Sequence, residues 1–497
     1  MLFEHDAHYY AEQVRSGIVT ASELVERALA NIQQLNPILN AVTIVQATTA
    51  REQARQQDRQ LQAMTPAERQ QLPPFWGVPT LLKDLGQHQQ GQPATEGSYL
   101  VGNYIAKRND HFVTAVEAAG FIIVGRTNTP EFGFKNISDS KRNGRVNSPF
   151  DKERNAGGSS GGAGAALKAG IVPIVMASDG GGSIRIPASF NGLIGLKPSR
   201  GRIPVGPTNY RGWQGASINF ALTRSVRDTW TLLKSLQVEQ YEAPFMLPRI
   251  QQTRLQPLTQ PLRIAYTFET PFGEPISSDA RAAVEIAITH LRAQGHTLVE
   301  ARPTVDGERL IRDYYLVNGV ETAAMMTHMG HPPREAMELM TWAIYQLGLS
   351  VSAVEYTQLL TRWDYYGVAL ERFYREYDAL LMPTTNGGAP RHDAFTPDAT
   401  TWQQLQQIDQ YEQAQRLELI CQMFQKGLDY TPFGMQMNLA GQPAISLPIA
   451  QTAEGLPIGI QLSSAKGQDY RLLQLAQQFE QAGMLDSRVV EVRKSTL

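Results

Sequence analysis

The sequence predicts a single large α/β domain, and three features of its pattern support this prediction. Short apolar runs bounded by glycine and proline begin abruptly near Phe75 and are typical of buried strands. Segments with helical periodicity separate these runs, so the region from about 75 to 235 alternates between strand and helix. The chain has no internal repeat and no low-complexity tail, which favours one elaborated domain over a string of modules. The apolar runs lie at 78–82, 121–125 and 171–177, and the helical segments at 111–119 and 163–169.

Residues 1–74 are expected to form an N-terminal helical segment packed on this core. A capping box at 20–23 marks the start of one helix. A second box at 65–68 places Pro66 at the first helical position, where proline is well tolerated. Apolar residues follow the first box at helical spacing, at Leu24, Ala28 and Ile32.

Residues 75–497 are expected to form the second and larger part of the chain. The stretch 314–374 is rich in aromatic residues and methionine, which indicates either core helices or a helical insertion, at about 305–375, over a functional site. Gly483 is expected to end the last amphipathic helix, which contains Leu472, Leu475 and Phe479. Further strands are expected at 262–266 and 378–382, and a hairpin at 443–449 and 457–462.

The composition narrows the partners that the chain can have. With 45 Lys and Arg against 47 Asp and Glu, the net charge of -2 gives no general attraction to nucleic acid or an anionic membrane, so a small-molecule substrate is expected. A single cysteine, Cys421, excludes an internal disulfide framework and a cysteine-based zinc site. The acidic N-terminus and the lack of an apolar run of about 18 residues predict a cytoplasmic protein. No nucleotide-binding glycine motif or metal-ligand set occurs, so no cofactor and no metal are expected.

Two glycine-rich blocks, at 155–162 and 178–187, each surround serine with glycine. Closely spaced glycines cost backbone entropy and are expected where the chain turns tightly or presents bare N–H groups. In the second block, successive N–H groups can point at one position, as an oxyanion hole requires, and Ser183 would lie there as the nucleophile. The expected oxyanion donors are the N–H groups of Gly180, Gly181, Gly182 and Ser183.

Lys83 is the candidate base for this serine. None of the 9 histidines lies in a motif that marks a catalytic base, whereas Lys83 ends the largely apolar run 77–84. A lysine accepts a proton near neutral pH only when its pKa falls from about 10.4, and burial among apolar neighbours lowers it. Asp84 would oppose that shift, but adjacent side chains of an extended segment point to opposite faces.

Together these residues resemble the amidase signature family, over residues 75–235 and again across the C-terminal 65 residues. Three separated blocks match the family pattern, at 77–84, 157–162 and 179–185. The resemblance implies one large domain with a central mixed sheet covered by helices on both faces. It further implies that Ser183 is the nucleophile of an acyl-enzyme mechanism, activated by a relay through Ser159, held by a cis peptide bond, and Lys83. Asp179 and Arg185 would brace the oxyanion loop.

The C-terminal segment 431–438 resembles the branch of free-standing amidases that includes aryl acylamidases and 6-aminohexanoate cyclic-dimer hydrolases. The substrate would then be a small amide, which could be linear, aryl or cyclic. Its pocket would be lined by segments 131–145, 314–344 and 430–438. Within these segments the candidate pocket residues are Ile137, Phe433 and Asn438. The oligomeric state stays open, with a homodimer as one option.

Two other functions remain open at this level. Within the family, the chain could be the glutaminase subunit of a tRNA-dependent amidotransferase, which would require partner subunits. Outside it, residues 157–161 also fit the Gly-x-Ser-x-Gly elbow of an α/β-hydrolase esterase. That elbow follows directly on a strand and uses a histidine base, but the preceding residues 151–155 are polar.

Overall fold

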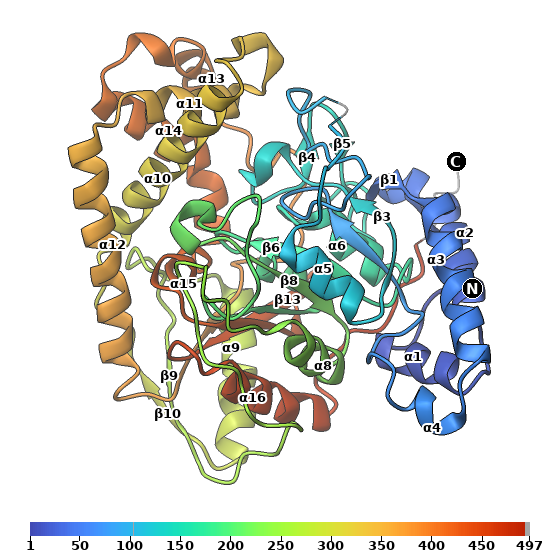
Figure 1. The fold of residues 1–497 in the computed structure, drawn as a ribbon. Coiled ribbons are helices and arrows are strands. Elements are labelled where there is room, and N and C mark those ends of the chain that lie inside the picture. Colours follow the sequence, from blue (N-terminus) through green and yellow to red (C-terminus); the bar gives the residue numbers. More distant parts are fainter. Residues whose placement is uncertain (103, 493–497) are drawn as a thin grey trace.

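Eleven strands form one mixed sheet in the computed structural model, which describes residues 1–102 and 104–492 (Figure 1). The strand order is β1-β3-β2-β6-β8-β7-β12-β13-β11-β9-β10, and a separate pair is formed by β4 (Asp139–Ser140) and β5 (Gly144–Arg145). The strands of the main sheet are β1 (Val42–Val45), β2 (Pro79–Lys83), β3 (Ile122–Thr127), β6 (Val175–Asp179), β7 (Ile194–Lys197), β8 (Ile218–Thr223), β9 (Arg263–Tyr266), β10 (Thr297–Glu300), β11 (Ala379–Pro383), β12 (Ala444–Gln451) and β13 (Pro457–Ser463).

The sheet combines two parallel regions with an antiparallel centre. Strands β3, β2 and β6 run parallel, as do β11, β9 and β10, whereas the strands between β6 and β11 pair antiparallel. Every residue of β2, β3, β6, β7, β11 and β13 is buried. Strands buried on both faces require cover on both faces. The prediction of a mixed sheet covered by helices on both faces is confirmed.

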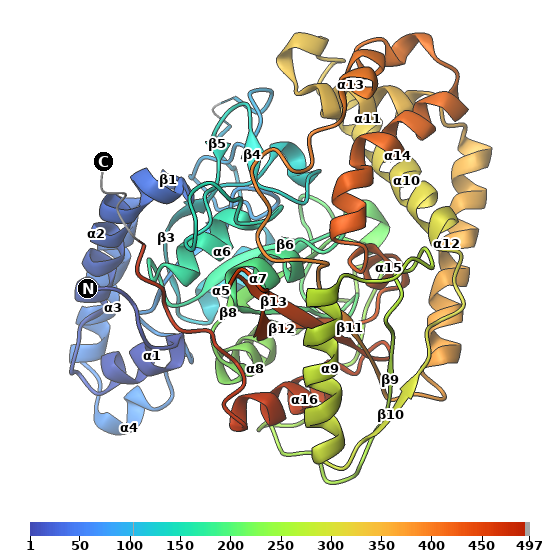
Figure 2. The same cartoon turned by 180° about the vertical axis from the view of Figure 1, so that it is seen from behind.

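In the described residues, 1–102 and 104–492, sixteen α-helices surround the sheet. Figures 1 and 2 show their arrangement. They are α1 (Ala7–Arg15), α2 (Ala21–Leu39), α3 (Ala47–Gln62), α4 (Pro66–Arg69), α5 (His111–Ala118), α6 (Gly161–Lys168), α7 (Arg185–Asn191), α8 (Val226–Leu236), α9 (Ser278–Ala293), α10 (Gly307–His328), α11 (Leu339–Leu349), α12 (Ala353–Phe373), α13 (Ala399–Leu405), α14 (Gln413–Tyr430), α15 (Met435–Ala440) and α16 (Asp469–Gln481). Of the helices within 1–102 and 104–492, none is long and apolar enough to cross a membrane.

Most of the strands expected from sequence are present, with two differences. The run 171–177 becomes a strand only from Val175, because Pro173 has no N–H with which to continue a ladder. Residues 1–74 contain not only helices but also β1, a four-residue strand that pairs antiparallel with β3 at the sheet edge. The strands at 262–266 and 378–382, the hairpin of β12 with β13, and the last helix are confirmed.

Helices α10 to α14 form a layer beside the sheet with its own apolar core (Figure 1). Its buried residues include Leu316 on α10, Ile344 on α11 and Trp363 on α12. Helices α10 and α11 approach closely because each has a glycine where they cross, Gly319 on α10 and Gly348 on α11. A Cβ at Gly348 would lie 1.8 Å from the carbonyl oxygen of Gly319. The aromatic stretch 314–374 is therefore mainly core, but it is the core of this helical layer.

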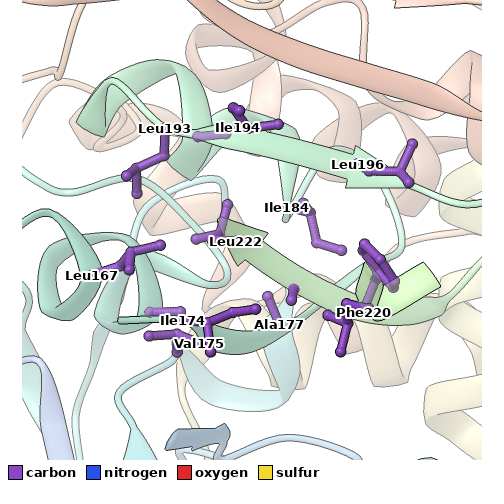
Figure 3. Close-up of a cluster of buried hydrophobic side chains, with 14 of the residues drawn as sticks. Leu167, Ile174, Val175, Ala177, Ile184, Leu193, Ile194, Leu196, Phe220 and Leu222 are labelled. Carbon is purple, nitrogen blue, oxygen red and sulfur yellow. The ribbon is translucent and has the colours of Figure 1, made fainter. Parts of the chain in front are cut away.

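The sheet places two segments with candidate catalytic residues at one edge. Strands β2 and β6 are parallel neighbours, with Leu81 paired to Val175, so Lys83 and Asp179 leave the sheet at the same carboxyl edge. Figure 3 shows side chains of β6, β7 and β8 in one apolar cluster together with Ile184. Because Ile184 is fully buried, the residue directly after Ser183 is anchored in the core.

Candidate active site

Lys83 is the last residue of β2, and its side chain is completely buried. Its Nζ lies 2.7 Å from Ser159 Oγ and 3.0 Å from Ser178 Oγ. Its backbone N–H donates to Gln87 Oε1 at 2.8 Å, which fixes the end of the strand. The amine is therefore held between two serine hydroxyls from different segments.

Burial lowers the pKa of Lys83 from 10.5 to about 7, although the carboxylates of Asp179 and Glu96 oppose the shift. The adjacent Asp84 does not contact the amine, because its carboxylate accepts hydrogen bonds from the N–H and hydroxyl of Thr95. A large fraction of Lys83 is therefore neutral near pH 7 and able to accept a proton.

The two serines of the first glycine block face different partners. Ser160 Oγ donates to the carbonyl oxygen of Ser178 at 3.2 Å, whereas Ser159 Oγ faces Lys83. The peptide bond between Gly158 and Ser159 is cis. Only glycine fits at position 158, since a Cβ there would lie 2.6 Å from the backbone of Ile137. Of the pair, Ser159 is the one in contact with the Lys83 amine.

The loop after β6 holds Ser183 at the wall of a cavity that Ser159 and Ser178 also line. Gly182 has φ +117, a conformation that side chains rarely adopt. Its N–H donates to Asp179 Oδ1 at 2.8 Å and is unavailable to a substrate. The expectation of four oxyanion donors is therefore reduced to three, the N–H groups of Gly180, Gly181 and Ser183. In residues 1–102 and 104–492, no hydrogen bond joins Ser159 Oγ to Ser183 Oγ.

A buried ion pair between Asp179 and Arg185 holds the loop that contains Ser183. Both side chains of Asp179 and Arg185 are inaccessible, and Arg185 Nη2 lies 2.9 Å from Asp179 Oδ1. Burial alone would raise the pKa of Asp179, but the charge and hydrogen bonds of Arg185, together with Asn438, hold it well below its usual value. The same carboxylate accepts the N–H groups of Gly182 and Ile184 at 2.8 and 3.2 Å.

Asn438 hydrogen-bonds to both members of the Asp179–Arg185 pair, so its expected place in the substrate pocket is wrong. Its Nδ2 donates to Asp179 and to the carbonyl oxygen of Ala216, and its Oδ1 accepts from Arg185 at 2.7 Å. The side chain is 1% exposed and lines no part of the cavity with the serines. An amide saturated by such bonds has no capacity left for a substrate.

The cavity beside the serines has a volume of about 710 Å³. Segment 131–145 contributes Phe134, whose ring stacks on Trp213 with centroids 6.2 Å apart, and segment 314–344 contributes residues from Glu321 to Met329. Segment 430–438 contributes nothing, because Phe433 is buried in the main core. Ile137 lines a second cavity of about 500 Å³ instead. The pocket prediction is thus wrong for Ile137 and Phe433.

Sequence reasoning missed several residues of the site. Ser178 forms a hydrogen bond of 3.0 Å with Lys83, and its signal was its place at the start of the second glycine block. Gln87 accepts from Lys83 and donates to Ala177 and Asn219, linking β2, β6 and β8. Much of the cavity wall comes from segment 200–219, an irregular stretch that no periodic pattern marks.

No three His, Cys, Asp or Glu side chains within the described ranges 1–102 and 104–492 gather as a metal site would require. Ser183, Ser159 and Ser178 line one cavity, and the buried Lys83 amine contacts Ser159 and Ser178. The arrangement places a serine hydroxyl and loop N–H groups at the wall of one cavity, with a buried amine of lowered pKa behind two further serines of that wall.

Comparison with known proteins agrees with this arrangement. The family model described as Amidase matches residues 23–473. A lipoamidase of Enterococcus faecalis is 41% identical over 488 residues, covering 97% of this chain and 64% of that protein, so the chain spans less than two thirds of that relative. The 6-aminohexanoate-cyclic-dimer hydrolase of Paenarthrobacter ureafaciens is 32% identical, with 96% of this chain and 94% of that protein covered.

Solved structures show the same similarity. The structure of 6-aminohexanoate cyclic dimer hydrolase complexed with substrate has a TM-score of 0.85 and 30% identity, covering 98% of this chain and 99% of that chain. A bacterial aryl acylamidase of the amidase signature enzymes has the same fold, with a TM-score of 0.81 and 23% identity over 97% of this chain and 96% of that chain. With matches along nearly its whole length, the chain belongs to the amidase family and is an amide-hydrolysing enzyme.

Proposed function

We propose that the chain hydrolyses the carbon–nitrogen bond of a small amide through an acyl-enzyme on Ser183, activated by a relay of Ser159 and Lys83. The observation that supports this most strongly is the buried, partly neutral Lys83 amine, 2.7 Å from Ser159 Oγ and beside the cavity that holds Ser183. Serine hydroxyls are weak nucleophiles until a base removes their proton, and here the base is part of the same site.

The first half of the reaction moves one proton in two short transfers. Ser183 Oγ attacks the amide carbonyl carbon and gives its proton to Ser159 Oγ, which gives its own proton to Lys83 Nζ. Ser178 Oγ, 3.0 Å from Nζ, keeps the amine oriented toward Ser159. The N–H groups of Gly180, Gly181 and Ser183 stabilise the oxyanion, and one such donor contributes roughly 3 kcal/mol.

The second half returns the proton and releases the acyl group. Ser159 protonates the leaving nitrogen and takes a proton back from Lys83 Nζ, which restores the neutral amine; protonation is required because an unprotonated amine leaves badly. Water then attacks the acyl-enzyme by the same relay and restores Ser183. A cavity of about 710 Å³ with aromatic walls at Phe134 and Trp213 accommodates an amide of moderate size. Linear, aryl and cyclic amides all fit this description.

The nucleophile can be identified by covalent labelling. A fluorophosphonate should modify Ser183 in a 1:1 ratio, because only this serine combines the loop N–H groups with access to the cavity. Peptide mass analysis locates the adduct. The Ser183→Ala protein should take up no label, and the Ser160→Ala protein should keep it at Ser183. An adduct on Ser160 would contradict the assignment.

A turnover screen over anilides, aliphatic and cyclic amides and glutamine separates a free-standing amidase from an amidotransferase subunit.

The relay also predicts how activity depends on pH. Protonated Lys83 cannot accept a proton, so kcat/KM should fall about tenfold per pH unit below a midpoint near the Lys83 pKa of about 7. Above that pH the amine is neutral and the rate should level off. The measurement is kcat/KM for a neutral anilide between pH 5 and 9. A rate that is flat over this range would show that no group titrating near 7 serves as the base.

A further inference from the structure

Glu96 lines the cavity in a backbone conformation that is unusual for its residue type. Its φ is +53, a region that costs a non-glycine residue about 1 kcal/mol and that recurs at active sites. Its carboxylate accepts the N–H of Gly86 at 3.2 Å and lies 2.9 Å from His88 Nε2. The strained turn therefore holds a carboxylate at the cavity wall.

Asp110 lies at the same wall and has an unmet acceptor. Its side chain is 9% exposed, and its Oδ2 accepts the N–H of His88 at 2.9 Å. Its Oδ1 is buried without a hydrogen-bond partner in the part of the chain that the structure describes. The His88 ring approaches the other oxygen, with Nδ1 3.7 Å from Oδ2. A buried carboxylate oxygen without a donor is costly and points to a ligand that supplies one.

The charges around this wall do not balance. Glu96, Asp110 and the buried Asp84 face one permanent cation, Arg126, whose Nη1 donates to the carbonyl oxygen of Lys83 at 3.2 Å. Burial alone would lower the pKa of His88, but the Glu96 and Asp110 carboxylates raise it. Burial raises the pKa of Asp84 and favours its neutral form, so with His88 neutral the Glu96 and Asp110 carboxylates exceed the single Arg126 cation by one negative charge.

The wall adjoins the reacting groups. Gly86, which donates to Glu96, follows Leu85, and both line the cavity with Ser159 and Ser183. The Leu85 side chain and Ser159 Oγ both lie within 3.2 Å of the position that a Cβ on Gly133 would take. The cavity wall between the serines and the carboxylates therefore includes Leu85 and Gly86.

We propose that Glu96 and Asp110 form a subsite for an ammonium group, so that the amides this enzyme prefers carry a primary amine in addition to the scissile bond. The ammonium donates to Asp110 Oδ1 and lies against the Glu96 carboxylate, while its alkyl chain lies against Leu85. This inference rests on the proposed hydrolysis for its meaning, but the subsite can be measured without turnover.

The test is calorimetric titration of the Ser183→Ala protein with hexylammonium and, as a neutral partner of the same length, 1-hexanol. Hexylammonium should bind at least about tenfold more tightly, the scale of one charge-assisted hydrogen bond. Glu96→Gln added to this protein should reduce the ratio to below about threefold. Gln keeps an oxygen for the Gly86 N–H, and a thermal melt checks folding. Asp110→Asn should have the same effect and replaces Glu96→Gln if that variant does not fold.

Glu321 provides the matched control within the same cavity. It also lines the cavity, but it belongs to α10 and its carboxylate accepts from Gln214 Nε2 at 3.3 Å. Glu321→Gln removes the same charge and should leave the binding ratio unchanged. Equal binding of the two ligands, or an equal loss in Glu321→Gln, would overturn the subsite. If the proposed hydrolysis through Ser183 were wrong, the protein that retains Ser183 would take up no fluorophosphonate label there. The binding ratio of hexylammonium to 1-hexanol would then stay as expected.

Discussion

Replacing Lys83 with methionine is expected to lower kcat/KM for an anilide by about 10² to 10⁴-fold, the usual contribution of a positioned general base. Methionine has nearly the length of lysine and no basic nitrogen, so the Ser159 hydroxyl loses the acceptor 2.7 Å away. The free energy of unfolding should be unchanged or higher, because the cost of burying the amine disappears. Steady-state kinetics and a urea melt on the same preparation measure both quantities.

Lys197 offers a matched control for this substitution. It is also fully buried, and burial lowers its pKa to about 7, as it does for Lys83. Its Nζ, however, donates to the carbonyl oxygen of Pro198 at 3.0 Å and, among the residues that the structure describes, forms no hydrogen bond with a serine. Lys197→Met should keep kcat/KM within about threefold, since it removes a buried amine but no proton acceptor. Near-normal turnover in Lys83→Met, or an equal loss in Lys197→Met, would contradict a specific role for Lys83.

The parts of the fold that the sequence predicts well are those fixed by local pattern. The runs that became β2 and β3 are apolar throughout and stay buried on both faces. The box at 20–23 caps α2 as expected. In contrast, the four-residue strand β1 is half buried at an edge, and its pairing with β3 depends on residues about 80 positions away along the chain. No local pattern contains that information.

The candidate active site shows the same difference between local sequence patterns and contacts that depend on tertiary packing. Glycine-wrapped serines and a lysine after an apolar run are short, contiguous patterns, so Lys83 and Ser159 were expected together before their contact was known. The pocket residues were not, because side chains at a wall are chosen by tertiary packing rather than by spacing. Asn438 illustrates this: its amide is directed into the Asp179–Arg185 pair and away from the cavity. Ser178 opens the second glycine block, but its contact with Lys83 depends on the pairing of β2 with β6, which no local pattern contains.

Replacing Asp179 with alanine is expected to lower the free energy of unfolding by about 3 to 5 kcal/mol, because it leaves the Arg185 guanidinium buried without its counter-charge. The carboxylate also accepts the N–H groups of Gly182 and Ile184, so the loop that carries Ser183 should lose its conformation and amide hydrolysis should be lost as well. Denaturant melts followed by circular dichroism measure the first effect, and anilide kinetics measure the second.

Two further variants separate the buried charge from a general loss of contacts. Adding Arg185→Met to Asp179→Ala should recover part of the stability, since it removes the unpaired cation, but not all of it, because Gln461 Oε1 and Asn438 Oδ1 then lose their donor. At the surface, Arg227→Ala breaks a pair with Asp6 whose arginine is 54% exposed, and it should cost under about 1 kcal/mol. If Asp179→Ala cost no more than Arg227→Ala, the pair would not be what holds the Ser183 loop, and the fixed orientation of its N–H groups would need another cause.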